Sequence, residues 1–260
     1  RFYEMPDVEG FLIDLGGVVY QEGKPIPGSI EAIVQLRDAG IPFRFLTNTT
    51  SKPKSSILKN LMAIGIPVEG HEIFTPAVAA RAYIVAHDLK PHLFISPQLR
   101  EDFQDIRTGT IPAVIVGDAG DGVTYRNMNL AFRHLEAGAE LIALASNRKF
   151  VDDNGKMSLD VGAYVAALEF ASGKQATVLG KPSHEFFLSA VNAMRLAVGE
   201  TAMIGDDAEF DASAAVKAGL IGVLVRTGKW KPGATDGIEP PPTAEFQNLR
   251  QAVDRLLCQD

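Results

Sequence analysis

Short apolar runs alternate with amphipathic stretches along most of the chain, and this pattern indicates buried strands joined by helices. The apolar runs are too short for helices, and several end in a polar residue or glycine, as buried strands entering loops do. They predict strands at Phe11–Asp14, Phe43–Thr47, Ala176–Gly180, Ala202–Asp206 and Ile221–Val225.

The stretches between them carry apolar residues at helical spacing. Helices are predicted at Gly28–Ala39, Lys54–Ile64, Ser183–Met194 and Asn248–Leu257. The residues expected on the buried side of the first helix are Ile30, Ile33, Val34 and Leu36. Those of the second helix are Ile57, Leu58, Leu61 and Met62. Those of the third helix are Phe187, Ala190, Val191 and Met194.

Alternation of this kind predicts an α/β fold with a doubly wound parallel sheet and helices on both faces. Residues 82–173 have a strand and helix alternation of their own, which we interpret as an inserted α/β cap domain. The core domain would then be discontinuous, with residues 1–81 and 174–260. Within the insertion, Asn147–Asp160 is expected to form a hairpin that turns at Asp152–Gly155.

Composition narrows the function classes. The 260 residues are 46% hydrophobic and 22% charged, as in ordinary soluble globular proteins. A net charge of −7 without a Lys/Arg cluster argues against nucleic-acid binding, and no apolar run reaches the roughly 18 residues of a membrane span. The single cysteine, Cys258, excludes an internal disulfide, so a reducing, cytoplasmic setting is expected.

Carboxylates gather where predicted strands end, which is where ligands bind in open parallel sheets. Asp14 ends one strand, Asp206 ends another, and Asp207 and Asp211 follow soon after. So many anions can accept a phosphate group only if a cation neutralises them, and oxygen-only ligands suit Mg²⁺. Gly16 has no side chain, but its backbone carbonyl can also serve as a ligand to a hard cation.

Phosphate-binding candidates follow two other strands. Thr47, Asn48 and Thr49 offer hydroxyl and amide groups, and Lys181 offers a point charge between Gly180 and Pro182. Taken singly, each of these residues fits a turn, a helix cap or a solvated surface position. The set at several strand ends favours a catalytic or binding site.

The order Asp14, Thr47, Lys181 and Gly205–Asp211 resembles the four motifs of the haloacid dehalogenase-like hydrolases. The resemblance extends over nearly the whole chain and is greatest to the capped NagD-type branch, on these segments: Phe45–Thr50, Glu72–Thr75, Tyr125–Asn129, Ala167–Ala171, Gly180–Pro182 and Val225–Lys229.

This resemblance implies a Rossmann-like core and a phosphatase that forms a phosphoaspartyl intermediate. Asp14 would be the nucleophile, Mg²⁺ would be held by Asp14, the Gly16 carbonyl and Asp206, and the phosphoryl group would be held by Thr47 and Lys181. Asp207 and Asp211 would support the site from behind these ligands. The cap would exclude water and select the leaving group of a small phosphorylated substrate, and an exposed apolar cap surface would predict a homodimer.

The chain departs from the family pattern at Gly16, where most phosphatases of the superfamily carry an Asp that protonates the leaving group. Relatives in this branch resemble it in lacking that carboxylate. One hypothesis is a phosphohydrolase suited to leaving groups that need little protonation, such as those of P–N or pyrophosphate bonds. Another is that water or a cap residue serves as the acid. The alternative is a weakly active or inactive phosphate-binding regulatory homologue.

Overall fold

The computed structural model describes residues 7–107, 109–151 and 156–257. Within these, the chain divides into two compact units. The first unit contains the residues up to 47, 57–74 and those from 181 onward; the second contains 48–56 and 75–180. The narrower cap at 82–173 stays a prediction, as do the core bounds that go with it.

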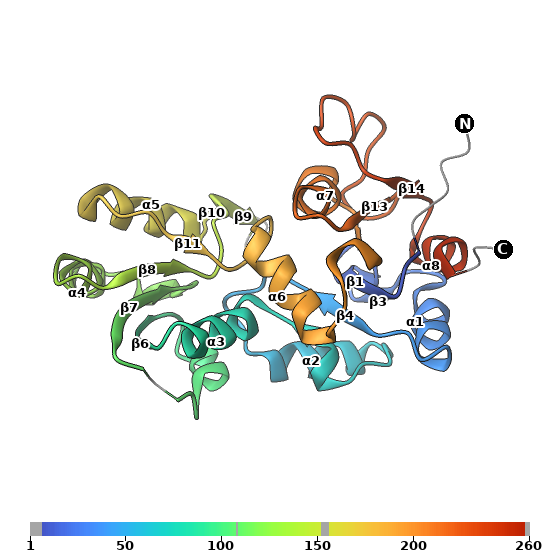
Figure 1. Ribbon diagram of the computed structural model, residues 1–260. Helices are drawn as coiled ribbons and strands as arrows, with labels where there is room; N and C mark the ends of the chain where they lie inside the picture. Colours follow the sequence, from blue (N-terminus) through green and yellow to red (C-terminus); the bar gives the residue numbers. More distant parts are fainter. Residues whose placement is uncertain (1–6, 108, 152–155, 258–260) are drawn as a thin grey trace. The chain divides into compact units, whose positions relative to one another are not determined.

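The first unit is built on a six-stranded parallel sheet with the order β14-β13-β12-β1-β4-β5 (Figure 1). A short antiparallel pair, β2 and β3, follows β1 along the chain. The strands of this unit are β1 (Gly10–Asp14), β2 (Tyr20–Gln21), β3 (Lys24–Pro25), β4 (Phe43–Leu46), β5 (Ile73–Phe74), β12 (Thr201–Gly205), β13 (Ile221–Val225) and β14 (Ala244–Phe246).

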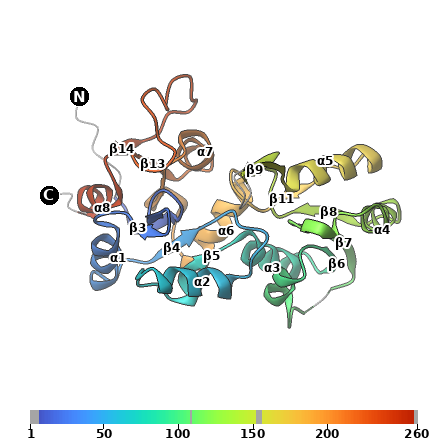
Figure 2. The same cartoon turned by 180° about the vertical axis from the view of Figure 1, so that it is seen from behind.

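The central strands are largely apolar because both faces of the sheet are covered. All residues of β1, β12 and β13 are buried. Figures 1 and 2 show α1 (Ser29–Asp38) beside α8 (Leu249–Leu257), and both contribute to one core cluster with the sheet. The remaining helices that contribute to this unit are α2 (Lys54–Ala63), α6 (His184–Met194) and α7 (Ala214–Lys217).

Two predicted core positions are wrong. Val34 is 41% exposed and Met62 is 61% exposed. In α1 the buried stripe is Ser29, Ala32, Ile33 and Leu36, so Val34 lies one residue, or about 100°, away from Ile33 and faces outward. In α6, by contrast, all four predicted positions are buried.

The second unit contains a four-stranded parallel sheet with the order β11-β8-β7-β6 and a separate antiparallel pair, β9 and β10. Its helices begin at side-chain caps, with Thr75, Thr124 and Asp160 each accepting a hydrogen bond from a backbone N–H. The elements are α3 (Pro76–Ala86), β6 (Leu89–Phe94), β7 (Ile111–Val116), α4 (Tyr125–Glu136), β8 (Glu140–Ala143), β9 (Lys149–Val151), β10 (Met157–Leu159), α5 (Val161–Ser172) and β11 (Thr177–Val178).

The strand predicted at Ala176–Gly180 does not belong to the core sheet. The observed strand, β11, pairs in parallel with β8 of the second unit through Thr177 and Val178. Its apolar run identified a strand, but such a run does not specify which sheet the strand joins. Lys181 therefore follows a strand of the second unit and precedes α6 of the first.

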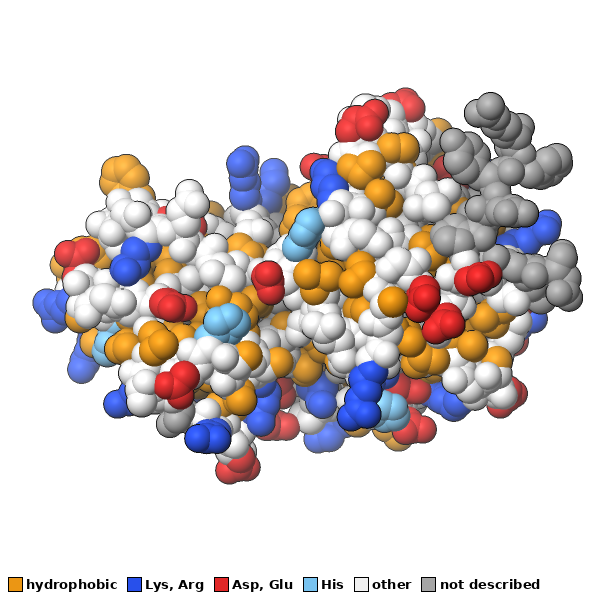
Figure 3. Space-filling model, in the orientation of Figure 1, with side chains coloured by type: hydrophobic (Ala, Val, Ile, Leu, Met, Phe, Trp, Pro, Cys, Tyr) orange, Lys and Arg blue, Asp and Glu red, His pale blue; other side chains and the backbone are white. Residues whose placement is uncertain are grey.

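Three further predictions concern turns, covalent links and the membrane. The pair β9–β10 forms the two sides of the predicted hairpin, whereas its turn, Asp152–Gly155, lies outside the described residues, as does Cys258. No helix in the described part of the chain is both long and apolar enough to cross a bilayer. On the face drawn in Figure 3, Lys and Arg side chains are scattered among acidic ones.

Candidate active site

Three predicted site residues follow neighbouring strands at one edge of the core sheet. Asp14 ends β1, and Asp206 comes directly after β12, which pairs with β1. On the other side of β1, Asp14 lies in register with Leu46 of β4, and Thr47 follows. Because all three strands are parallel, their carboxyl ends lie at the same edge of the sheet.

Lys181 contacts two of the predicted carboxylates. Its Nζ donates to Oδ1 of Asp14 at 2.5 Å and to Oδ1 of Asp211 at 2.8 Å. All three residues are buried, with Lys181 only 7% exposed. The predicted nucleophile and the predicted phosphate-binding cation are thus direct partners, and the ammonium stabilises the ionised carboxylates.

The two carboxylate oxygens of Asp206 differ in their hydrogen bonding. Its Oδ2 accepts a hydrogen bond from the backbone N–H of Lys229 at 2.8 Å. Its Oδ1 is buried and has no hydrogen-bond partner among the described residues. A buried carboxylate oxygen without a hydrogen-bond partner is costly, and coordination to a cation would remove that cost.

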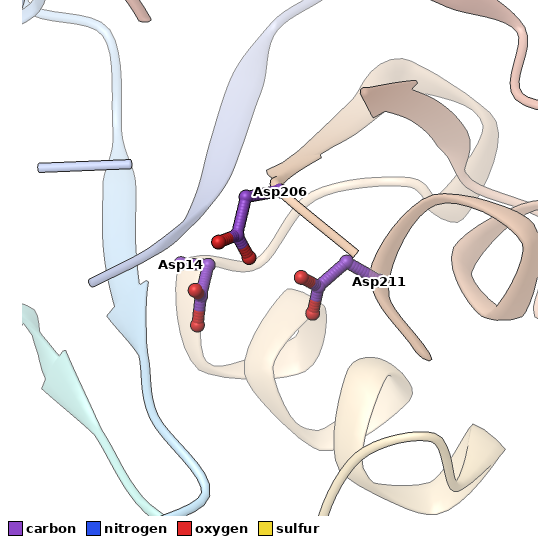
Figure 4. Close-up of side chains that lie close together, drawn as sticks. All are labelled: Asp14, Asp206 and Asp211. Atoms are coloured by element: carbon purple, nitrogen blue, oxygen red, sulfur yellow. The ribbon is translucent and has the colours of Figure 1, made fainter. Parts of the chain in front are cut away.

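The carboxylates of Asp14, Asp206 and Asp211 converge, as Figure 4 shows. One oxygen from each lies within 4.8 Å of the others. The residues fit a metal ion, because the donors are hard oxygens and Asp206 Oδ1 lacks a partner in the described structure. Asp211, expected behind the ligands, is close enough to offer a ligand atom itself.

A π-helical turn, Ala208–Ser213, positions Asp211 and gives Asp207 a different role. Asp207 caps this turn, because its Oδ1 accepts hydrogen bonds from the backbone N–H groups of Glu209 and Phe210. Its Oδ2 lies 3.4 Å from the Nζ of Lys229. π-Helical turns frequently occur at functional sites, and this one aims Asp211 inward and Asp207 at the backbone.

Burial and charge shift the ionisation of these groups. Burial raises the pKa of Asp14 to about 7, although the nearby Lys181 opposes the rise. Burial by itself would lower the pKa of Lys181, but attraction to Asp14 and Asp211 outweighs it and raises that pKa. Burial also raises the pKa of Asp206, against the hydrogen bond from Lys229. Without a further cation, the ionised forms of Asp14 and Asp206 are therefore disfavoured.

The loop after Asp14 has room for a side chain at one glycine and none at the next. A Cβ at Gly16 would meet no atom of the described chain within 4 Å. Gly17 has a φ of 81°, which favours glycine, and a Cβ there would lie 2.9 Å from the Cα of Gly228. The carbonyl of Gly17 accepts a hydrogen bond from Oγ1 of Thr227 at 2.5 Å.

Thr227 and the Lys229 backbone are site residues to which the sequence analysis gave no role. Both lie in the loop that follows β13, at the same edge of the sheet as Asp14 and Asp206. The strand-end rule that identified Asp206 could have found them. Their contacts are difficult to predict from residue type, because Lys229 donates its backbone N–H and Thr227 donates to a backbone carbonyl.

Asn48 and Thr49 belong to the second unit, whereas Thr47 belongs to the first. The backbone N–H of Thr47 donates to the carbonyl of Phe74 at 3.3 Å, which continues the pairing of β4 with β5. Asn48 lies beside Gly180, where a Cβ would come 2.8 Å from its Oδ1. Phosphate binding by Thr47, Asn48 and Thr49 stays a prediction.

Comparison with known proteins identifies the family. Residues 11–107 match the sequence profile of a family described as haloacid dehalogenase-like hydrolase, and residues 178–252 match a related profile described as HAD-hydrolase-like. Haloacid dehalogenase-like hydrolase domain-containing protein 2 from Homo sapiens is 36% identical over 250 residues, which cover 96% of each chain. The chain belongs to the haloacid dehalogenase-like hydrolases.

A second relative and a solved structure are also similar to this chain. Phospholysine phosphohistidine inorganic pyrophosphate phosphatase from Rattus norvegicus is 38% identical over 256 residues, covering 96% of this chain and 94% of that protein. The solved structure of NagD from E. coli K-12 has a TM-score of 0.85, with 23% identity, and the match covers 95% of this chain and 98% of NagD. The α/β parallel-sheet fold and the resemblance to the NagD-type branch are confirmed.

Proposed function

We propose that this hydrolase is a Mg²⁺-dependent phosphohydrolase that acts on small phosphorylated compounds through a phosphoaspartyl intermediate. The observation that carries the proposal is the arrangement around Asp14. Its buried carboxylate ends the central strand, is paired with Lys181, and converges with Asp206, whose Oδ1 has no hydrogen-bond partner among the described residues.

Charge balance supports the metal. One ammonium, from Lys181, and the three carboxylates of Asp14, Asp206 and Asp211 leave two negative charges when all are ionised. Asp14, Asp206 and the Gly16 carbonyl would hold Mg²⁺. Once bound, Mg²⁺ would neutralise this excess and offset charge on the phosphoryl oxygens.

The chain's own residues carry the reaction. An oxygen of Asp14 attacks phosphorus, and the O–P bond forms as the bond to the leaving group breaks. The leaving group departs with the electron pair and takes a proton from water. Thr47 and Lys181 hold the phosphoryl oxygens throughout. Water then attacks phosphorus, and inorganic phosphate leaves as the Asp14 carboxylate is restored.

The residue at position 16 indicates which kind of substrate bond is cleaved best. Gly16 supplies no proton donor, so leaving groups that need little protonation should react best. The name of the matched phospholysine phosphohistidine inorganic pyrophosphate phosphatases points to P–N and pyrophosphate bonds. We therefore propose that phosphoramidates and pyrophosphate are better substrates than alkyl phosphates.

The test is phosphate release from imidodiphosphate, pyrophosphate, phosphohistidine and p-nitrophenyl phosphate, with Mg²⁺ and with EDTA. Asp14→Asn should abolish release, whereas the matched control Asp38→Asn, at the exposed end of α1, should keep wild-type rates. Activity in Asp14→Asn, or full activity in EDTA, would show that the nucleophile or the metal is wrongly assigned.

A second candidate is a phosphate-binding regulatory homologue with little turnover, and Gly16 is the observation that favours it. It predicts that pyrophosphate binds in the presence of Mg²⁺ but that none of the four compounds is hydrolysed. The cap at 82–173, a homodimer formed through it and a cytoplasmic location remain predictions of this proposal.

A further inference from the structure

The segment Thr227–Lys229 makes two hydrogen bonds to different parts of the candidate active site. The Oγ1 of Thr227 donates to the carbonyl of Gly17 at 2.5 Å. Two residues later, the backbone N–H of Lys229 donates to Oδ2 of Asp206 at 2.8 Å. One short loop after β13 thus connects the loop after β1 with the carboxylate after β12.

The direction of the Gly16 carbonyl is set by the peptide that it shares with the N–H of Gly17. The backbone N–H of Gly17 donates to the carbonyl of Tyr20 at 2.8 Å. Since the Gly16–Gly17 peptide is trans, the Gly16 carbonyl must point the opposite way, away from Tyr20. With its N–H held by Tyr20 and its carbonyl held by Thr227, Gly17 is fixed on both sides.

Close packing makes this arrangement rigid. Gly17 and Gly228 both have positive φ, 81° and 58°, and each lies against the other and against the Asp206 carboxylate. A Cβ on Gly228 would be 2.6 Å from the Cα of Gly17. The two loops can approach this closely only because both residues are glycine.

We propose that Thr227 is a positioning residue for metal binding, which it supports by fixing Gly17 and hence the Gly16 carbonyl relative to Asp206. The proposal rests on the metal site of the proposed function. Thr227 does not contact the metal or the substrate. Removing a group that orients metal ligands in this way typically weakens metal affinity by about 10- to 100-fold.

The experiment measures Mn²⁺ binding by electron paramagnetic resonance titration of the free ion, which needs no turnover. Mn²⁺ suits the same oxygen ligands as Mg²⁺. Thr227→Val keeps the shape of the side chain and removes the donor, so its Kd should rise about 10-fold or more. Thr227→Ser keeps the hydroxyl and should stay within about threefold of the wild type.

Thr243→Val is the matched control. The Oγ1 of Thr243 also makes a hydrogen bond to the main chain, accepting from the N–H of Gly222 at 3.2 Å, but it contacts no residue of the site. Its loss should leave the Kd for Mn²⁺ unchanged. In an activity assay, Thr227→Val should raise the Mg²⁺ concentration needed for half-maximal rate more than it lowers kcat at saturating Mg²⁺.

A wild-type Kd in folded Thr227→Val, checked by circular dichroism, would overturn the inference, as would equal losses in Thr227→Ser and Thr227→Val. If Thr227→Val does not fold, Thr227→Cys carries the test. Its thiol is a weak donor, so an intermediate Kd is expected and a wild-type Kd would refute the role. Absence of Mn²⁺ binding by the wild type would refute the metal site itself.

Discussion

Replacing Gly16 by Asp tests whether this chain lacks only a proton donor. The substitution Gly16→Asp is one that the structure can accept. A Cβ at Gly16 would meet no described atom within 4 Å, and the φ of Gly16 lies outside the left-handed region. Because the position is also exposed, the free energy of unfolding should change by less than about 1 kcal/mol.

The expected gain depends on the leaving group. General acid catalysis typically contributes about 10²- to 10⁴-fold, or roughly 3–5 kcal/mol of barrier. The introduced carboxyl would extend into open space, since a Cβ at Gly16 meets no described atom within 4 Å, and it could donate a proton to the leaving group. An alkyl phosphate needs that proton, so its kcat/KM should rise about 100-fold. Nitrophenolate leaves without a proton, so p-nitrophenyl phosphate should change by less than about threefold.

The assay compares kcat/KM for glycerol phosphate and p-nitrophenyl phosphate in wild type, Gly16→Asp and Gly16→Asn. The Asn variant has nearly the same size but cannot act as an acid. An equal gain in Gly16→Asn would show that bulk at position 16, rather than acidity, matters. No gain in Gly16→Asp would refute the reasoning, and another group would then already protonate the leaving group.

Three further predictions concern stability and are checked by urea denaturation in EDTA. Burial raises the pKa of Asp14 from 3.8 to about 7, so the folded state binds a proton at Asp14 more tightly than the unfolded state does. The free energy of unfolding of the wild type should therefore fall as the pH rises from 3.8 to about 7. Asp14→Asn should lack this contribution to the pH dependence. Lys181→Met leaves two buried carboxylates without their ammonium partner and should lower the free energy of unfolding by about 3–5 kcal/mol at neutral pH. An unchanged urea midpoint would contradict the burial of these ion pairs. Gly17→Ala forces a Cβ against Asp206 and should lower the free energy of unfolding several times more than Gly23→Ala does. Gly23 has a similar φ of 72° but open space around it. Equal losses of stability would mean that the packing around Gly17 is not tight.

The strands at the centre of the core sheet were predictable because both of their faces are buried. Such strands are largely apolar, as β1, β12 and β13 are, and the pattern does not depend on which residues they pack against. The rule that ligands bind beyond the carboxyl ends of parallel strands then singled out Asp14 and Asp206, whose carboxylates converge, and Thr47, whose role stays a prediction.

What could not be predicted depends on long-range pairing. The strand β11 has an apolar run like those of the core, but its partner is β8 of the second unit, and nothing local specifies that choice. Asp207 and Asp211 are both acidic and close in sequence. Only the π-helical turn determines that Asp207 caps the backbone while Asp211 reaches Lys181.

The hydrogen bond from Lys229 to Asp206 has a consequence for how this sequence can vary. The donor is a backbone N–H, which every residue except proline can supply. Saturation mutagenesis at position 229 should therefore preserve this bond in every variant but Lys229→Pro. The residue type at this position can diverge among homologues while its contact to Asp206 persists, because the support comes from the path of the main chain.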